Sequence, residues 1–300
     1  MKLAFDISSV TVTEFGVGRD DGNPPFVTIP VDAEVQAALQ EMVSATREAM
    51  ASDADGPRRY EPSEKYGSIE YLTLPLSDEL GSAVRELHEA ANIPINAQAL
   101  ADPATVFCYF ARMTDSKGRR LTAVRRAAQF KGILRSRLVR IVTNSLKLID
   151  DRVFKLDSDF DLLMDADSIH ILRPSGFEFT GRLQEAILAA VPSNIQDIQK
   201  DLDFVELAGI EEYAAKHPRA ARYLASIRGQ METKDIDRSR LKKLCKNTGV
   251  EVTESHGKIN VVPGHEIGFL EVLDRRRYEL ELVQGQPERF KAASRTKIRP

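Results

Sequence analysis

Between residues 106 and 172 the chain alternates short β-forming segments with turn residues, and this alternation constrains its fold most strongly. The run VFCYFARM at 106–113, the turn residues at 115–118 and the apolar positions leading to Arg126 predict a β-hairpin. Further short strands are predicted at Leu138–Thr143, Leu146–Ile149, Val153–Leu156 and Ser168–Leu172. Short, closely spaced strands favour an antiparallel meander or half-barrel. With helices predicted on both sides of it, the fold class is α+β.

Positive charge is concentrated in the same part of the chain. Residues 112–155 hold 13 Lys/Arg against 3 Asp/Glu, a net charge of about +10, whereas the whole chain carries −3. Such a field favours a polyanionic partner, because phosphate contacts need charge and reach but no base code. The plain alternative is a face of solvated charges. The predicted nucleic-acid contacts here are Arg119, Arg120, Arg125, Arg126, Lys131, Arg135, Arg137 and Arg140.

A second basic block, DIDRSRLKKLCK, predicts a helix. Leu241, Leu244 and Cys245 fall on its apolar face. A hairpin is predicted to follow, with strands at Val250–Thr253 and Ile259–Val262. A helix followed by a hairpin partly resembles a winged DNA-binding arrangement, although the first helix of a helix-turn-helix pair is not evident. The helix adds four predicted phosphate contacts, namely Arg238, Arg240, Lys242 and Lys243.

The first hundred residues predict a small, acidic α+β domain. Val31–Met50 has the apolar spacing of a helix, with Asp32 as its N-cap. Gly16–Pro30 has the composition of a loop, and a second helix is predicted from Ser77. The irregular segment Asn92–Pro103 predicts a domain boundary.

The remainder of the chain is predicted to form a larger domain with a helical C-terminal layer. A capping box at Ser175 opens a helix that is expected to end at Val191, before Pro192. The alanine-rich helices that follow suit close packing or dimerisation. The predicted domains are 1–103 and 104–300, the second divided into a basic β core at 104–175 and a helical, basic part at 176–300.

Three stretches resemble a known family. They are RRLTAVRRAAQFKGILRSRLVRIV, KLDSDFDLLMDADSIHILRPSGFEF and the closing GFLEVLDRRRYELELVQGQPERFKAASRTKI. Together they resemble the Kiwa protein KwaB-like family of bacterial anti-phage proteins, over about 104–298, with Arg173-Pro174 as a departure from the expected polar turn. The resemblance implies a closing leucine-rich helix, a short linker and a terminal basic segment at Ser294-Arg295. It also implies a DNA-binding effector that works beside a membrane-embedded KwaA-like subunit. The matching residues are Phe130, Asp159-Phe160-Asp161, Ile169–Leu172 and Phe177-Glu178.

Catalytic and metal-binding patterns are weak. The aspartates between 157 and 167 open like a calcium loop, but no glycine or closing glutamate follows at the required spacing, so caps and turns are favoured. Glu232-x-Lys234 and Asp115-x-Lys117 have the local spacing of a magnesium-dependent nuclease, which chance also produces. His256 and His265 lack a third ligand. No catalytic residue, metal or cofactor is therefore predicted.

The resemblance implies a non-enzymatic DNA-binding effector that blocks replication or transcription of phage DNA, and the charge pattern is consistent with this role. Two alternatives remain open: a metal-dependent nuclease, and a scaffold in which basic blocks grip acidic blocks of a second copy. A homo-oligomer is expected. The two widely spaced cysteines, an N-terminus unlike a signal peptide and the lack of a long apolar run predict a cytoplasmic protein. The resemblance implies that a membrane partner recruits it to the inner membrane.

Overall fold

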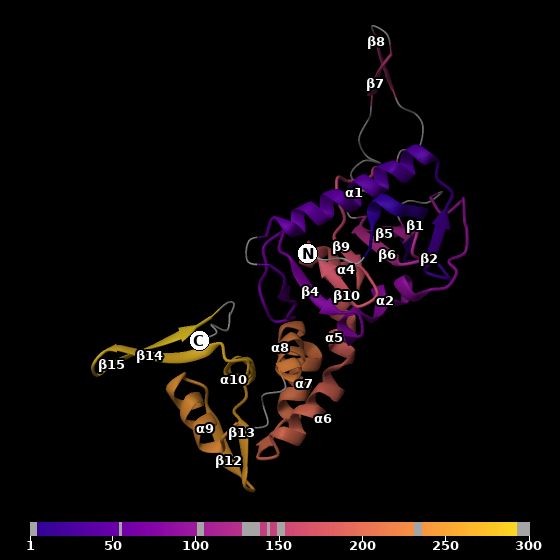
Figure 1. The fold of residues 1–300 in the computed structure, drawn as a ribbon. Helices are drawn as coiled ribbons and strands as arrows, with labels where there is room; N and C mark the ends of the chain where they lie inside the picture. The colour runs from indigo at the N-terminus through magenta and orange to yellow at the C-terminus, as the bar shows by residue number, and fades with distance from the viewer. Residues whose placement is uncertain are drawn as a thin grey trace. The chain divides into compact units, whose positions relative to one another are not determined.

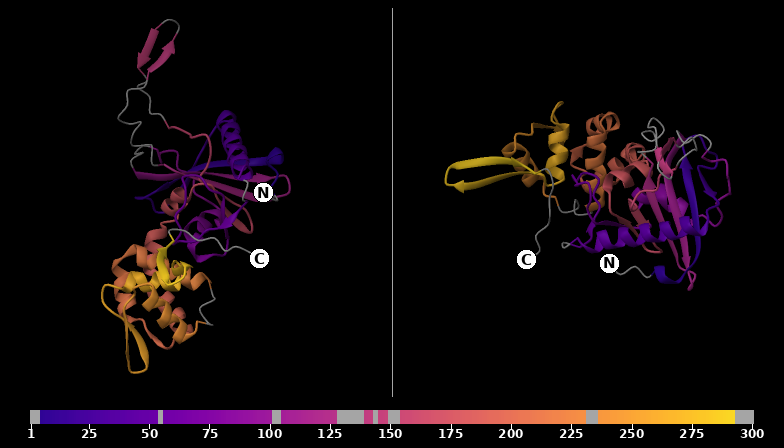
Figure 2. Two further views of the ribbon diagram at one scale, coloured as in Figure 1. Left: turned by 90° about the vertical axis from the view of Figure 1, so that its left-hand side faces the viewer. Right: turned by 90° about the horizontal axis from the view of Figure 1, so that it is seen from above.

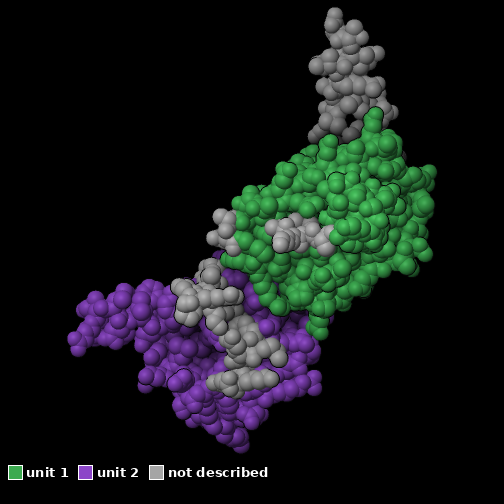
Figure 3. Space-filling model, viewed as in Figure 1, with its two compact units in different colours: residues 1–59, 66–183 green, residues 60–65, 184–300 purple. Residues whose placement is uncertain are grey.

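The computed structural model divides the chain into two compact units. It describes residues 5–53, 56–100, 105–127, 139–142, 145–148, 154–230 and 236–292, with the backbone alone for 139–142 and 145–148. Unit 1 comprises residues 1–59 and 66–183, and unit 2 comprises residues 60–65 and 184–300 (Figure 3). The boundary predicted near residue 103 falls inside unit 1, because strands from both sides of it share one sheet.

Unit 1 is built on an eight-stranded sheet in the order β2-β1-β5-β6-β9-β10-β4-β3. All neighbouring strands are antiparallel except β3 and β4, and the α+β fold class is confirmed. The strands are β1 (Val10–Arg19), β2 (Phe26–Ile29), β3 (Arg58–Arg59), β4 (Leu72–Pro75), β5 (Val106–Asp115), β6 (Arg120–Arg126), β9 (Leu162–Met164) and β10 (Ser168–Ile171). The helical elements are η1 (Ile7–Ser9), α1 (Ala33–Ala51), η2 (Glu79–Gly81), α2 (Ser82–Glu89) and α4 (Pro174–Thr180).

The predicted loop at Gly16–Pro30 is confirmed only for residues 20–25, because β1 continues to Arg19 and β2 pairs with it. The two glycines that suggested a loop serve the sheet instead. A Cβ on Gly16 would lie 2.2 Å from Cζ of Phe110, and one on Gly18 would lie 2.7 Å from Sγ of Cys108. Glycine therefore marks close approach of β5 side chains here, not a turn.

Helices cover both faces of this sheet. The long helix α1 runs along one face (Figures 1 and 2) and buries Leu39 and Val43 against it. Its predicted N-cap is confirmed, since Asp32 Oδ1 accepts a hydrogen bond of 2.8 Å from the Val35 amide. On the other face, His88 of α2 bonds Thr122 of β6, and α4 packs against β6.

The remaining strand predictions of the β core have mixed outcomes. The hairpin of β5 and β6 is confirmed, as are short paired strands at β7 (Val139–Val142) and β8 (Ser145–Leu148). Residues 154–156 form no strand, whereas the unpredicted β9 completes the sheet between β6 and β10.

Unit 2 contains helices, a small sheet and a separate hairpin. Its helices are α5 (Leu183–Ala189), α6 (Val191–Asp201), α7 (Ala208–Lys216), α8 (Pro218–Gln230), α9 (Arg238–Asn247) and α10 (Glu266–Leu273). The strands β11 (Val205–Glu206), β12 (Val252–Ser255) and β13 (Lys258–Val261) form a sheet in the order β11-β13-β12. Strands β14 (Arg277–Val283) and β15 (Gln286–Lys291) pair antiparallel. The linker expected after the closing leucine-rich helix is therefore wrong, because a hairpin follows α10.

Two prolines mislead the helix prediction. The helix expected from Ser175 to Val191 is instead divided into α4 and α5, and Pro192 lies in the first turn of α6. Pro174 likewise opens α4, and Ser175 makes no capping bond there. Proline is tolerated in a first turn because the amide there has no intrahelical acceptor.

Replacing Gly176 by alanine should destabilise unit 1. The added Cβ would lie 2.2 Å from Oδ2 and 2.3 Å from Cγ of buried Asp161, so the carboxylate would have to move. We expect a loss of about 1–3 kcal/mol, measured by chemical denaturation followed by circular dichroism. Gly209→Ala is the control, because a Cβ there meets nothing within 4 Å in helix α7. An equal effect of both substitutions would contradict the explanation.

Candidate nucleic-acid interface

The arginines of β6 were predicted to contact phosphates, but the structure engages them inside unit 1. Arg119 Nε donates a hydrogen bond of 2.7 Å to Oδ2 of Asp115, which is almost fully buried. Burial opposes ionisation of this carboxyl, but hydrogen bonds from the side chain and amide of Arg119 hold its pKa well below the usual range. Arg120 Nη1 donates to the carbonyls of His88 and Ala90, at 2.9 and 3.2 Å, and so completes the end of α2.

Arg125 is the centre of an ion cluster. Its guanidinium lies 3.2 Å from Asp157, 3.3 Å from Asp159 and 2.7 Å from Asp161. Burial raises the pKa of Asp161, although Arg125 acts in the opposite direction. Arg173 also pairs with Asp159, at 2.7 Å. These three aspartates therefore serve ion pairs within the fold, whereas the interpretation favoured from the sequence was caps and turns.

Arg126 is also partly covered. Its amide donates to Oδ2 of Asp161 at 2.8 Å, and its guanidinium carbon lies 3.9 Å from the ring centroid of Phe179. Arg119 and the three arginines of β6 thus have packing or polar partners within unit 1. Of the other predicted contacts in this stretch, Lys131, Arg135 and Arg137 lie outside the described residues, and Arg140 lies in β7, where only the backbone is described.

Helix α9 presents its cations differently. Asp237 caps it through a bond of 2.8 Å to the Arg240 amide, and Leu241 and Cys245 face the core. The side chains of Arg240 and Lys243 are exposed, and no ion pair is found for either within the part of the chain that the structure describes. Both are therefore available to an anionic ligand.

Two other cations of α9 share one carboxylate. Arg238 and Lys242 each lie 2.9 Å from Glu254 of β12. Hydrogen bonds from Lys242 and Arg238 lower the pKa of this exposed glutamate. These pairs fasten α9 to the neighbouring strand, and such exposed pairs contribute little stability.

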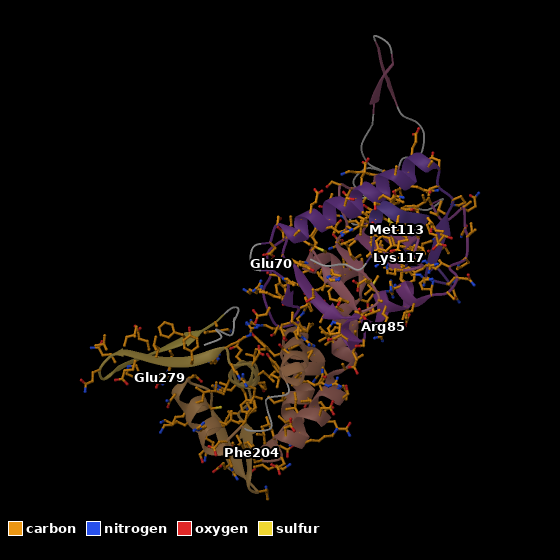
Figure 4. All side chains as sticks on the ribbon, viewed as in Figure 1. Glu70, Arg85, Met113, Lys117, Phe204 and Glu279 are labelled. Carbon is orange, nitrogen blue, oxygen red and sulfur yellow. The ribbon has the colours of Figure 1, made fainter. Side chains whose placement is uncertain are left out.

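A three-stranded sheet packs beside α9. β12 and β13 form the expected hairpin, whose turn at His256 and Gly257 has φ angles of 50° and 75°. β11, a strand of two residues, pairs parallel with β13. The carbonyl of Phe204, labelled in Figure 4, accepts a hydrogen bond of 2.8 Å from Ile259. Strand β11 was missed, because two residues carry no periodic signal.

A buried carboxylate fixes the base of the last hairpin. Glu271 of α10 is fully buried and pairs with Arg277 of β14 at 2.8 Å and Arg219 of α8 at 3.1 Å. Lys291 of β15 pairs with the same carboxylate. Burial alone would raise the pKa of Glu271, but Lys291 and Arg277 reverse the effect and lower it. Both strands are thus tied to the body of unit 2.

The nuclease motifs do not assemble a metal site in the described part of the chain. Asp115 is occupied by Arg119 and several amides, and Glu232 and Lys234 lie outside the described residues. No group of three or more His, Cys, Asp or Glu side chains suited to a metal ion occurs among the described residues. His265 Nδ1 accepts a hydrogen bond of 3.2 Å from the Glu251 amide, and among the described residues it belongs to no group suited to a metal ion.

The chain matches a known protein family. The family described as Kiwa protein KwaB-like matches residues 107–282, more than half of the sequence. The chain belongs to the Kiwa protein KwaB-like family. Membership of this family supports a role for the chain as a component of Kiwa anti-phage defence. No curated protein and no solved structure matches the chain.

The KwaB-like match runs from β5 in unit 1 to β14 in unit 2 and so includes both the β6 arginines and α9. It begins after the N-terminal strands that complete the large sheet, and it ends before β15. Within the described residues, none of the helices has the length and apolar character needed to cross a membrane.

His88, next to Arg120, should make stability depend on pH. Burial, with help from Arg120, lowers the pKa of His88 from 6.5 to about 4. Between these values the unfolded chain takes up a proton that the folded chain does not, so stability falls as pH falls through this window. We expect a slope of at most about 1.4 kcal/mol per pH unit in denaturation experiments. His88→Gln should reduce this slope of stability against pH. Identical slopes for the wild type and the variant would exclude His88 as the cause.

Proposed function

We propose that this KwaB-like chain is a DNA-binding component of a Kiwa anti-phage system, and that α9 with the neighbouring hairpin contacts the phosphate backbone. The observation that carries this proposal is the exposure of Arg240 and Lys243 on a helix beside a three-stranded sheet. Residues 237–262 hold six Lys/Arg against three Asp/Glu, so the paired glutamate does not cancel the positive charge. A helix followed by a β-hairpin is an arrangement used for DNA binding.

The second source of charge is the segment that follows β6. Residues 128–153 hold six Lys/Arg against two Asp in the sequence, and they include Lys131, Arg135, Arg137 and Arg140. Contacts of this type release counterions and carry little sequence information, so they suit a protein that must bind any phage genome. A protein bound along the backbone blocks replication or transcription without breaking a bond.

Membership of the family also favours a partner. A Kiwa system has several components, and we propose a membrane-embedded KwaA-like subunit as the partner that brings this chain to the inner membrane. The chain itself would then stay in the cytoplasm, with DNA as its ligand.

Neutralising two cations of α9 should weaken DNA binding and its salt dependence. In Arg240→Gln/Lys243→Gln, loss of two phosphate contacts should reduce the slope of log K against log salt by about 1.8, since each contact on duplex DNA contributes about 0.9. The measurement is fluorescence anisotropy of the full chain with a labelled duplex of about 30 base pairs across a salt series.

The matched control removes the same charge elsewhere in unit 2. Lys200 and Lys216 are exposed and pair with Asp197 and Glu212, so Lys200→Gln/Lys216→Gln should leave the slope unchanged. Equal losses in both variants would show that net charge acts, not α9. The same samples with Mg²⁺ should contain intact DNA on a gel, and cleaved DNA would support the nuclease alternative.

We further propose that two copies of the chain associate through the β14–β15 hairpin. Tyr278 and Phe290 stack across its strands with centroids 5.6 Å apart, and Leu280 and Leu282 continue the exposed apolar row. A two-stranded hairpin alone is marginally stable in water. A second hairpin is a suitable cover, because an apolar face is complementary to its own copy and gives a closed twofold contact.

Charges placed in this row should dissociate the oligomer. Leu280→Asp/Leu282→Asp should convert a dimer to a monomer in size-exclusion chromatography with light scattering, because charge in an apolar interface is poorly solvated. Ile69→Asp is the control, since Ile69 is an exposed apolar residue of unit 1 and does not belong to the hairpin. A wild-type chain that remains monomeric at high concentration would contradict the proposal.

A further inference from the structure

One aromatic side chain of unit 1 is exposed at the end of a helix whose other phenylalanine is buried. Phe177 of α4 is fully buried, whereas Phe179 in the last turn of the same helix is 42% exposed. The Phe179 ring lies over the guanidinium of Arg126, with 3.9 Å between the guanidinium carbon and the ring centroid. Nε of Arg126 is buried and has no hydrogen-bond partner among the described residues. The ring thus packs on a cation while much of the phenyl group faces solvent.

A second arginine–phenylalanine pair adjoins the first. The guanidinium carbon of Arg182, three residues after Phe179, lies 5.4 Å from the ring centroid of Phe107. The carbonyl of Phe107 accepts a hydrogen bond of 2.9 Å from the amide of Ala127, the residue after Arg126. Two phenyl rings and two guanidinium groups from β5, β6 and the end of α4 therefore gather at one place.

Arg182 can contact an anion. Its side chain is 48% exposed, and its ion pair with Asp20 is 3.2 Å long between two largely exposed groups. An exposed pair of this kind contributes little free energy and is readily exchanged for a phosphate contact. In the sequence, the basic segment 128–153 begins directly after Ala127.

An exposed phenyl ring beside exchangeable arginines has the chemistry of a single-stranded nucleic-acid site. Such sites stack a base on an aromatic face and hold the neighbouring phosphate by charge. A base inside a duplex has neighbours on both faces, so only an unpaired base can offer its face to Phe179. A protein ligand would favour a wider apolar patch than one ring flanked by two cations.

We infer that Phe179, supported by Arg126 and flanked by Arg182, is a stacking site for one unpaired nucleobase and its phosphate. This inference rests on the proposed function and narrows its ligand, since unit 1 then contacts single-stranded DNA. Duplex binding through α9 of unit 2 does not depend on it.

The test compares two DNA probes on the full-length chain. Anisotropy is measured with labelled oligothymidine of about 15 nucleotides and with a duplex of the same length, each across salt. Phe179→Ala should weaken binding of the single strand by about tenfold, the loss expected for one stacked base. It should leave duplex affinity within about twofold and the salt slope unchanged, because no charge is removed. Arg182→Gln should instead lower the single-strand slope by about 0.7.

Two further variants separate stacking from loss of structure. Phe179→Leu keeps an apolar cover over Arg126 but removes the aromatic face, so it should lose affinity as Phe179→Ala does while its thermal melt stays near that of the wild type. Ile69→Ala, which shortens another exposed apolar side chain of unit 1, should bind like the wild type. Photocrosslinking with 5-iodouracil in the oligonucleotide should label the peptide that contains Phe179.

The outcomes distinguish failure of the stacking site from failure of the proposed DNA-binding function. Unchanged single-strand affinity in both Phe179 variants, equal losses on both probes, or a crosslink mapped elsewhere would overturn the stacking site and leave duplex binding standing. A wild-type chain that binds the duplex but not the single strand would do the same. A wild-type chain that binds neither probe would remove the proposed function together with this site.

Discussion

Asp161 is the residue on which the organisation of unit 1 depends most. Its carboxylate accepts hydrogen bonds from the Arg125 side chain and the Arg126 amide, and its carbonyl accepts one from Leu172. Gly176 of α4 packs against the same carboxylate, where no Cβ fits. Through its carboxylate and its backbone carbonyl, this one residue thus ties β6, the end of β10 and α4 together. Because a buried carboxylate left without its partner is strongly destabilising, Arg125 is committed to the fold whatever else it might bind.

Because arginines such as Arg125 are used in ion pairs within the fold, a high density of positive charge in a sequence does not by itself identify a binding surface. The block 112–155 carries a larger net charge than α9, about +10 against +5, yet Arg119 and Arg125 in it are paired with buried or half-buried carboxylates. Arg240 and Lys243 lie on a helix whose opposite face is buried, so their side chains extend into solvent. The carboxylates that pair with Arg125 come from the acidic stretch 157–161, more than 30 residues further along the chain. A count of charges along the sequence cannot show which blocks meet.

Strong local signals in the sequence predicted their elements correctly. The β5–β6 hairpin has a turn with Gly118 in a positive-φ conformation, α1 has a capping aspartate, and α9 has an apolar face, so each was found. The failures depend on long-range contacts. The extension of β1 through Gly16 and Gly18 requires the rings of β5, and the common sheet on both sides of residue 103 requires pairing between β1 and β5. In the last hairpin the apolar residues of β14 alternate, but both strands are largely exposed, so no buried core explains the alternation.

The two exposed aromatic sites differ in the chemistry around them, and this difference separates their proposed ligands. Tyr278 and Phe290 stack on each other beside leucines, with no arginine over either ring among the described contacts, which suits an apolar surface. Phe179 lies on a guanidinium, with a second arginine close by, which suits a base and its phosphate. The family match contains Phe179 and α9 but ends before Phe290. The residues proposed to contact nucleic acid therefore lie within the part of the chain that defines the family, whereas the proposed contact between copies is completed by a strand beyond it.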